Sequence, residues 1–386
     1  MNSFVFNFPK QFICKPGAVK ELGDICLRVV GKRVLIVTDQ GIVNAGLLQP
    51  VIDVLKAAAI EPIIFDKVEA DPAESIVLAA TGQAIAEGVD GVIGLGGGSS
   101  MDVAKLVALL AKGEEVLEDI YGVNLVKGRR LPLIQIPTTA GTGSEVTAVA
   151  IITVGEGEKK GVVSDQLLPD LALLDAELTL GLPPIVTATT GVDAMVHAIE
   201  AYTSHNPNHN LISDAVAKEA LVLLGGNIQA AITDGRNLEV RSNMLLGSML
   251  AGQAFANSPV AAVHALAYPL GGIYHLSHGL TNALVLPHVM RFNQVVCADL
   301  YAALAPLVFP ELRAIENSED RSNAFIDALA ELNVSLGIKD RLRDYDIPES
   351  AIPKLAEDAM KQTRLLVNNP REVSIDDALA IYQAAW

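Results

Sequence analysis

Residues 94–102 read GLGGGSSMD, a glycine-rich stretch that follows a short apolar run and precedes a segment of helical character. Glycines let the backbone approach a ligand closely, and the free amides of a helix N-terminus point at an anion, assisted by the helix dipole. A pyrophosphate would suit such a place. The spacing differs from the Rossmann fingerprint G-x-G-x-x-G, whose last glycine would fall at Ser99. The stretch predicts either a phosphate-binding loop or a tight turn between a strand and a helix.

Strand-like and helix-like segments alternate on both sides of this loop. Short apolar runs at 33–39, 62–65, 92–95 and 133–136 are typical of strands buried on both faces. Asp71 and Pro72 supply an N-cap and a first-turn proline for a helix that runs to about Glu87. This order predicts a parallel sheet with helices on both faces, that is, a Rossmann-like α/β dinucleotide-binding domain.

The pattern changes after the sequence GLPP at residues 181–184. Helical segments then follow one another with little strand-like sequence between them, at 192–201, 211–224, 238–255 and 322–332. We therefore predict two domains, an α/β domain at 1–182 and an all-helical domain at 183–386.

The N-terminus has its own pattern. Phe4, Phe6 and Phe8 alternate with polar or small residues before a turn at residues 15–17. This predicts a separate edge strand, and an exposed edge invites pairing with a second subunit. We expect a homodimer or a larger homo-oligomer.

Composition narrows the partners. The 386 residues carry a net charge of -17, which disfavours nucleic acid and anionic membranes as partners. Three cysteines without CxxC spacing, and an N-terminus without a secretion-signal pattern, favour the cytoplasm. Residues 242–290 contain no charged side chain, but glycines, prolines and histidines interrupt them, which predicts a deeply buried stretch.

A second loop and one carboxylate point to the same edge of the predicted sheet. Residues 137–145, PTTAGTGSE, follow another strand with four hydroxyls and two glycines, as a nucleotide-binding or a merely polar loop would. Ligands of open α/β sheets bind at the carboxyl ends of the strands. Asp39 ends the first strand, where a carboxylate accepts hydrogen bonds from ribose hydroxyls and repels a 2′-phosphate. The Asp39 carboxylate therefore favours NAD over NADP as the cofactor.

A set of metal-ligand residue types lies in the second half. Asp193 and His197 are four residues apart, so a helix would place them on one face. His264 and His278 lie in the uncharged stretch. Three imidazoles and a carboxylate would suit Fe²⁺ or Zn²⁺ with a position left for substrate, although Asp193 and His197 also fit a structural hydrogen-bonded pair.

Together these segments resemble the iron-containing (group III) alcohol dehydrogenase family. The resemblance runs from the N-terminal strand to about Asn293, and its most specific parts are GLGGGSSMDVAK, PTTAGTGSEVT, GVDAMVHAIEAY and HALAYPLGG followed by HG. It implies a dinucleotide-binding α/β domain, a helical metal and substrate domain, NAD as cofactor and one divalent ion, Fe²⁺ or Zn²⁺. The metal ligands it implies are Asp193, His197, His264 and His278. The cofactor residues it implies are Asp39, Gly96, Gly97, Gly98, Ser99, Asp102, Thr138, Thr139, Thr142 and Lys160.

The chain departs from the family pattern at two positions. Tyr268 stands where many members have a histidine that helps to carry the alcohol proton, and Ser277 stands where proline often precedes the last ligand. We expect Tyr268 or His275 to relay the proton.

The resemblance implies reversible hydride transfer between nicotinamide and an alcohol. Because the stretch around the histidines offers no cation, we expect a small neutral alcohol or diol. The alternatives are a maleylacetate reductase, a hydroxyacid–oxoacid transhydrogenase, a nucleotide-binding protein without turnover and a metal hydrolase.

Overall fold

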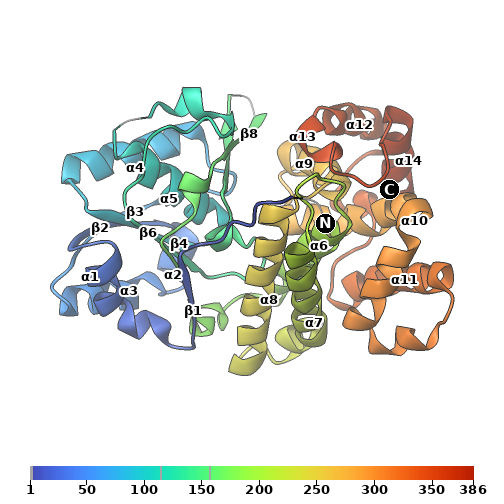
Figure 1. The fold of residues 1–386 in the computed structure, drawn as a ribbon, viewed down its shortest axis with the longest axis horizontal. Coiled ribbons are helices and arrows are strands. Elements are labelled where there is room, and N and C mark those ends of the chain that lie inside the picture. Colours follow the sequence, from blue (N-terminus) through green and yellow to red (C-terminus); the bar gives the residue numbers. More distant parts are fainter. Residues whose placement is uncertain (1–2, 114, 156–157) are drawn as a thin grey trace. The chain divides into compact units, whose positions relative to one another are not determined.

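The computed structural model describes residues 3–113, 115–155 and 158–386. The chain divides into two compact units (Figure 1). One is Asn7–Gly181, and the other joins Leu182–Trp386 to the segment that ends at Phe6.

The first unit is built on a six-stranded parallel sheet in the order β1-β9-β6-β4-β2-β3. Its strands are β1 Gln11–Cys14, β2 Arg33–Asp39, β3 Glu61–Val68, β4 Gly91–Gly96, β6 Leu133–Pro137 and β9 Leu171–Leu174. The four runs predicted from the sequence form β2, β3, β4 and β6, so the Rossmann-like parallel sheet is confirmed.

Helices cover both faces of this sheet because successive side chains of a strand point to opposite faces. Leu35 and Val37 of β2 pack with the helices α4 (Glu74–Glu87) and α5 (Gly98–Leu110). Val34 and Ile36 pack on the other face with α1 (Leu22–Val29) and α3 (Leu48–Ala57). Figure 1 shows the two pairs of helices on opposite sides of the strands.

A smaller three-stranded sheet accompanies the first. It consists of β5 (Gly122–Val123), β7 (Val149–Val154) and β8 (Glu158–Val163), with β7 and β8 antiparallel. This sheet was not predicted from the sequence: β5 has only two residues and β8 carries a charged start, although β7, VAIITV, is an apolar run.

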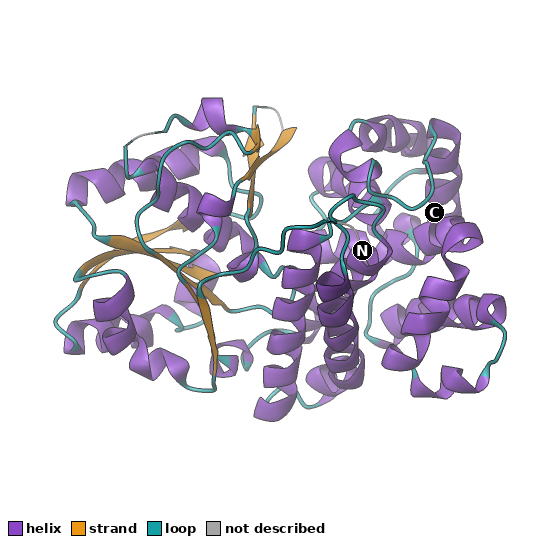
Figure 2. Cartoon of the chain, in the orientation of Figure 1, coloured by secondary structure: helices purple, strands orange, loops and turns teal. Residues whose placement is uncertain are grey.

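All the regular secondary structure of residues 182–386 is helical, with loops between the helices (Figure 2), and the structure describes every residue of this range. Its α-helices are α6 Pro184–Thr203, α7 Leu211–Thr233, α8 Leu238–Asn257, α9 Ala262–Tyr274, α10 His278–Val308, α11 Ser318–Ser335, α12 Ile352–Met360, α13 Thr363–Leu366 and α14 Ile375–Ala385. The four helical segments predicted from the sequence lie inside α6, α7, α8 and α11.

The predicted N-terminal strand was wrong in its position. The edge strand of the sheet is β1, Gln11–Cys14, whereas residues 3–9 have no strand assignment. Part of that segment bonds elsewhere, since the backbone N–H of Val5 donates to Asn208 Oδ1 and Asn208 Nδ2 donates to the Val5 carbonyl. Alternation of aromatic residues could not reveal this, because the pairing partner comes from far along the chain.

One helix among the described residues, α7, is long and apolar enough to cross a membrane by length and composition alone. It packs against α6, α8 and α10. Core helices of helical units often pass the same test, so the finding carries little weight.

The start of α10 lies close to α6, and a glycine makes this approach possible. A Cβ on Gly279 would lie 2.4 Å from the carbonyl oxygen of Thr189 and 3.3 Å from the Asp193 Cβ. The backbones therefore pack without a side chain between them, and this contact sets the position of His278 relative to Asp193.

We expect Gly279→Ala to destabilise the helical unit by about 1–3 kcal/mol, because overpacking forces the two helices apart. At about 2–4 °C per kcal/mol for a unit of this size, thermal unfolding followed by circular dichroism would detect the loss. The matched control is Gly272→Ala, since Gly272 is an exposed α9 residue whose added Cβ would meet nothing within 4 Å. A melting temperature of Gly279→Ala equal to that of Gly272→Ala would contradict the expectation.

Candidate metal cluster and cofactor loops

The predicted cofactor residues of the first unit gather at the carboxyl ends of three adjacent strands. Asp39 ends β2, Gly96 ends β4 and Pro137 ends β6. β4 lies between β2 and β6 in the sheet, and Gly96 is paired with Pro137. The three segments thus share the edge at which open α/β sheets bind ligands.

The glycine loop leads directly into α5. The helix begins at Gly98 with Gly97 as its N-cap, and residues 97–99 are only partly buried. Gly96 has φ 150°, and its Cβ would lie 2.8 Å from Ser100 Oγ, so a side chain is excluded there. Partly accessible amides at the start of a 13-residue helix form a suitable cradle for a pyrophosphate.

The second loop packs against the first. A Cβ on Gly98 would lie 3.0 Å from Thr142 Cγ2, and one on Gly97 would lie 3.8 Å from Thr139 Oγ1. Thr138 is buried, and its hydroxyl has no hydrogen-bond partner. Thr142 Oγ1 accepts from the Ser144 N–H at 3.3 Å. The structure therefore brings the three predicted threonines next to the glycine loop.

Asp39 is held by two protein contacts. Its Oδ1 accepts from the Ile42 N–H at 3.1 Å, which caps the short helix α2 (Gln40–Asn44). Its Oδ2 accepts from Ser100 Oγ at 3.0 Å. A carboxylate has about four lone-pair sites, so a fixed Asp39 still has capacity for ribose hydroxyls.

Two further predicted cofactor residues have protein partners. Asp102 Oδ1 accepts from Ser144 Oγ at 2.6 Å, and Asp102 Oδ2 accepts from the Ile151 N–H at 2.9 Å. Lys160 lies on β8 with its Nζ 5.4 Å from the centre of the Tyr121 ring. Asp102 thus ties α5 to the second loop and to β7.

In the helical unit, four side chains from three helices form one cluster. Asp193 and His197 lie one turn apart on α6, His264 lies in the first turn of α9, and His278 begins α10. One ligand atom from each residue lies within 4.8 Å of all the others. The imidazoles of His197 and His264 are stacked at 4.8 Å between centroids, and those of His264 and His278 are 5.2 Å apart. The structure therefore brings together all four residues that the sequence singled out.

The electrostatics of Asp193 suit a cation. The side chain is 1% exposed, and burial alone would raise the pKa of its carboxyl group. The three neighbouring imidazoles and a hydrogen bond from Asn282 outweigh burial and lower that pKa. The carboxyl group is therefore held in its charged form.

The side-chain amide of Asn282 lies close to acceptor atoms of three of the four cluster residues. Its Nδ2 lies 2.6 Å from Asp193 Oδ1 and 3.2 Å from Nε2 of both His264 and His278, while its buried Oδ1 has no partner. Three acceptors pointing at one small volume are what a divalent cation requires. The donor set of three nitrogens and one oxygen fits a borderline metal such as Fe²⁺ or Zn²⁺.

Glu200 supports the cluster from behind. Its Oε2 lies 2.5 Å from His264 Nδ1, and its Oε1 accepts from the Val263 N–H at 2.7 Å. The contact assigns the Nδ1 proton to the side facing Glu200 and leaves His264 Nε2 as the acceptor. Glu200 and Asn282 were not predicted from the sequence. Their spacing was a signal, since Glu200 follows Asp193 by seven residues on one helix and Asn282 follows His278 by four.

The two predicted proton-relay residues belong to α9 and its C-terminus, Tyr268 in the middle of the helix and His275 at its C-cap. The Tyr268 ring lies 6.0 Å from the His278 ring and is partly buried. His275 is an exposed residue in the left-handed conformation, with φ 55°, and caps the C-terminus of α9. Tyr268 is thus beside the cluster, whereas His275 faces solvent.

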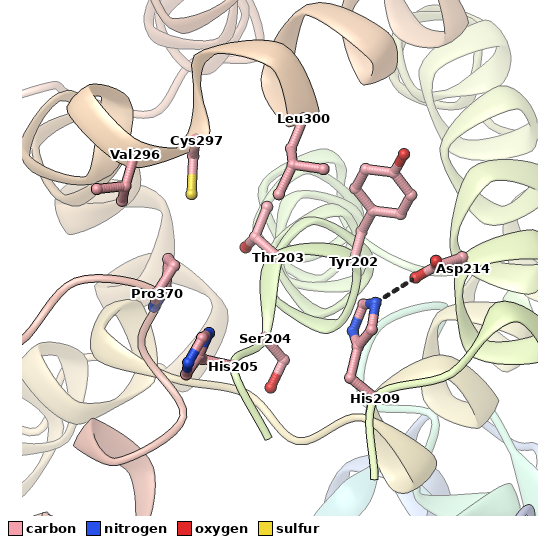
Figure 3. A pocket seen from close by; sticks show the side chains of 10 residues that line it. All are labelled: Tyr202, Thr203, Ser204, His205, His209, Asp214, Val296, Cys297, Leu300 and Pro370. Atoms are coloured by element: carbon pink, nitrogen blue, oxygen red, sulfur yellow. Dashed lines mark ion pairs between the residues drawn. The ribbon is translucent and has the colours of Figure 1, made fainter. Parts of the chain in front are cut away.

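A separate pocket of about 330 Å³ lies in the same unit (Figure 3). His205 and His209 line it from the loop between α6 and α7. His209 Nε2 lies 3.2 Å from Asp214 Oδ1, and this contact raises the pKa of His209. Neither histidine belongs to the Asp193 cluster.

The second cofactor loop contains one buried acid. Glu145 is 1% exposed, and its Oε1 has no hydrogen-bond partner. Burial raises the pKa of its carboxyl group from 4.5 to about 7, against the opposing effects of its backbone hydrogen bond and of the Lys105 charge. The folded protein therefore keeps a proton there that the unfolded chain releases above about pH 4.5.

This proton makes stability depend on pH. Folding takes up a proton between pH 4.5 and about 7, so stability falls as the pH rises through that window. We expect Glu145→Gln to match the wild type in melting temperature at pH 4.5 and to melt at a higher temperature at pH 8. A shift of about 2.5 pKa units at about 1.4 kcal/mol per unit makes the difference at most about 3.5 kcal/mol. Glu118→Gln, an exposed control, should track the wild type at both pH values. An equal pH dependence of Glu145→Gln and the wild type would refute the assignment.

Comparisons with known proteins agree with this geometry. Residues 9–176 match the model of iron-containing alcohol dehydrogenases, and residues 187–386 match the C-terminal model of the Fe-containing alcohol dehydrogenase family. The chain is 36% identical over 388 residues to a sulfoacetaldehyde reductase from Bilophila wadsworthia, covering 99% of both proteins.

Two solved structures share the fold over the whole chain. A 1,3-propanediol oxidoreductase superposes with a TM-score of 0.95 at 34% identity, covering 100% of both chains. A sulfoacetaldehyde reductase from Bifidobacterium kashiwanohense in complex with NAD⁺ superposes with a TM-score of 0.87 at 29% identity, covering 100% of this chain and 98% of the other. The chain belongs to the iron-containing alcohol dehydrogenase family and is an oxidoreductase of that family.

Proposed function

We propose that this protein interconverts a small neutral alcohol or diol and the corresponding aldehyde, with NAD(H) as the hydride carrier and one divalent ion bound by Asp193, His197, His264 and His278. Fe²⁺ is the favoured ion and Zn²⁺ the alternative. A divalent ion in such a cluster supplies a Lewis acid for the substrate. The observation that carries the proposal is the convergence of four ligand atoms within 4.8 Å, three from the buried residues Asp193, His197 and His264 and one from the exposed His278.

The α/β unit supplies the support for NAD(H). The amides at the start of α5 would bind the pyrophosphate, and Asp39 would accept hydrogen bonds from a ribose and disfavour a 2′-phosphate. Residues 138–142 would complete the site, with Lys160 nearby as a cation. The relative solved with NAD⁺ adds support for the cofactor class.

The surroundings of the cluster favour an uncharged substrate. The side chains in contact with its ligands include Phe255, stacked on His197 at 4.4 Å, Tyr268 and Asn282. An anionic substrate is usually bound by a guanidinium or an ammonium group. The relatives divide on this point, since one is named for a diol and another for sulfoacetaldehyde, which is an anion.

The proton route and the assembly complete the proposal. Tyr268 is the better placed of the two relay candidates, because its ring adjoins His278 while His275 is exposed. We also propose a cytoplasmic homodimer or larger homo-oligomer, since β1 is an edge strand and could pair with a second subunit.

The decisive experiment is NADH formation by metal-free protein reloaded with Fe²⁺ or Zn²⁺. The panel should contain ethanol, 1-propanol, 1,3-propanediol and 2-hydroxyethanesulfonate, the alcohol of sulfoacetaldehyde. We expect turnover only with metal, at least tenfold better with NAD⁺ than with NADP⁺, and fastest with a neutral alcohol. Preference for the sulfonate would overturn the neutral-substrate proposal. Hydrogen exchange between two substrates without added NAD⁺ would instead indicate a transhydrogenase.

The role of Glu200 gives a test that does not depend on turnover. We expect Glu200→Gln to weaken metal binding about 10–100-fold, because the charged acceptor that orients His264 is lost. Titration of metal-free protein with Zn²⁺ against a chromophoric chelator measures this. Glu219→Gln, an exposed acid on α7, is the control. Equal Zn²⁺ affinity of Glu200→Gln and the control would rule out the role.

A further inference from the structure

A buried lysine lies two turns inside the helix that begins at the glycine loop. Lys105 belongs to the stretch GLGGGSSMDVAK, where a lysine so near a phosphate loop suggests a phosphate contact, as in P-loop proteins. The structure places it differently. The side chain of Lys105 is 0% exposed, so its ammonium group cannot reach a ligand bound at the surface of the loop.

All the donors of this ammonium group are used inside the protein. Lys105 Nζ lies 2.7 Å from the Val149 carbonyl oxygen, 2.8 Å from Ser144 Oγ and 3.0 Å from Thr147 Oγ1. A fourth acceptor, Asp102 Oδ1, lies at 3.3 Å. An ammonium group has three N–H donors, and three acceptors at these distances satisfy it.

The contacts join two parts of the proposed cofactor site. Lys105 and Asp102 lie on α5, which presents the glycine loop at its N-terminus. Ser144 and Thr147 close the loop that carries the three threonines, and Val149 begins β7. Asp102 reinforces the connection through its own bonds to Ser144 and Ile151. The two loops are therefore tied together beneath the surface that faces the ligand.

Burying an ammonium group is costly, and a purely packing role would not require one. Desolvation lowers the pKa of Lys105, and the Asp102 carboxylate only partly offsets that effect. An unbranched apolar side chain of similar length could fill the same space without that cost. Such an apolar side chain would lack the directional hydrogen bonds of Lys105 Nζ. These bonds define the distance between α5 and the second loop.

We propose that Lys105 is a positioning residue that sets the separation between the glycine loop and the loop of residues 138–147, and thereby the affinity for a dinucleotide that spans both. The proposal rests on the proposed use of NAD(H). Lys105 acts through the two loops and touches neither the cofactor nor the substrate.

The test compares the binding of two ligands of different length, NADH and ADP. Lys105→Met keeps the length and apolar volume of the side chain but removes the ammonium group. In the proposed placement, the pyrophosphate lies at the glycine loop and the nicotinamide end of NADH extends along residues 138–147, whereas ADP ends at the pyrophosphate. Dissociation constants in the metal-free protein would come from nicotinamide fluorescence for NADH and from calorimetry for ADP. We expect the NADH dissociation constant to rise at least tenfold and that of ADP to change less than threefold.

Control variants separate this role from a general loss of structure. Lys112→Met changes an exposed lysine just beyond the end of the same helix and should bind NADH as the wild type does. Thr147→Val is nearly isosteric and removes one acceptor of Lys105, so a threefold to fivefold weakening of NADH is expected even if Lys105→Met folds poorly. Zn²⁺ affinity should stay the same in all variants, because the metal cluster belongs to the other unit.

Two results would overturn the proposal. The first is NADH binding by Lys105→Met and Thr147→Val that equals the wild type. The second is an equal weakening of NADH and ADP together with a lower melting temperature, which would show a structural role only. If the wild type itself binds no NADH, the proposed function fails, and the role of Lys105 fails with it.

Discussion

The Asp193 carboxylate is buried among helices, and much of the helical unit is arranged around the requirement that its charge be balanced. A buried carboxylate without partners would take up a proton, because desolvation penalises its charged form. Here the imidazoles of three residues and the amide of Asn282 surround it. These groups come from α6, α9 and α10, so the helices must meet closely at one point. Gly279 permits that meeting, since any side chain at this position would collide with the backbone of α6.

Glu200 contacts the cluster from its outer side, through His264. A histidine that presents Nε2 to a cation needs its Nδ1 proton accepted, and a carboxylate is the strongest acceptor available. Glu200 meets this need for His264 and also binds the backbone of α9 at Val263. One acid thus fixes both the ring and the helix that carries it. The layer behind the cluster is therefore hydrogen-bonded as well.

The α/β unit also contains a buried charge, here a positive one. The ammonium group of Lys105 is fully buried and is satisfied by a hydroxyl pair and a backbone carbonyl from one segment. In both units a buried charge with a complete set of partners joins chain segments that would otherwise be held only by packing. Apolar contacts are not directional, whereas hydrogen bonds to a charge fix distance and angle. Asp193 is itself a proposed metal ligand, and Lys105 lies behind the two loops proposed to bind the cofactor.

Local sequence determined the features that depend on neighbours along the chain. The apolar runs of β2 and β4, the glycines before α5 and the four-residue spacing of Asp193 and His197 are all local, because strand burial and helix periodicity act over a few residues. Resemblance to a family extended this to the four-residue cluster. Only the tertiary structure decided which strand lies at the sheet edge, that Lys105 faces inward, and that Glu200 and Asn282 support the cluster. These depend on which distant segments meet, and that choice is made by the packing of the whole unit rather than by any short stretch.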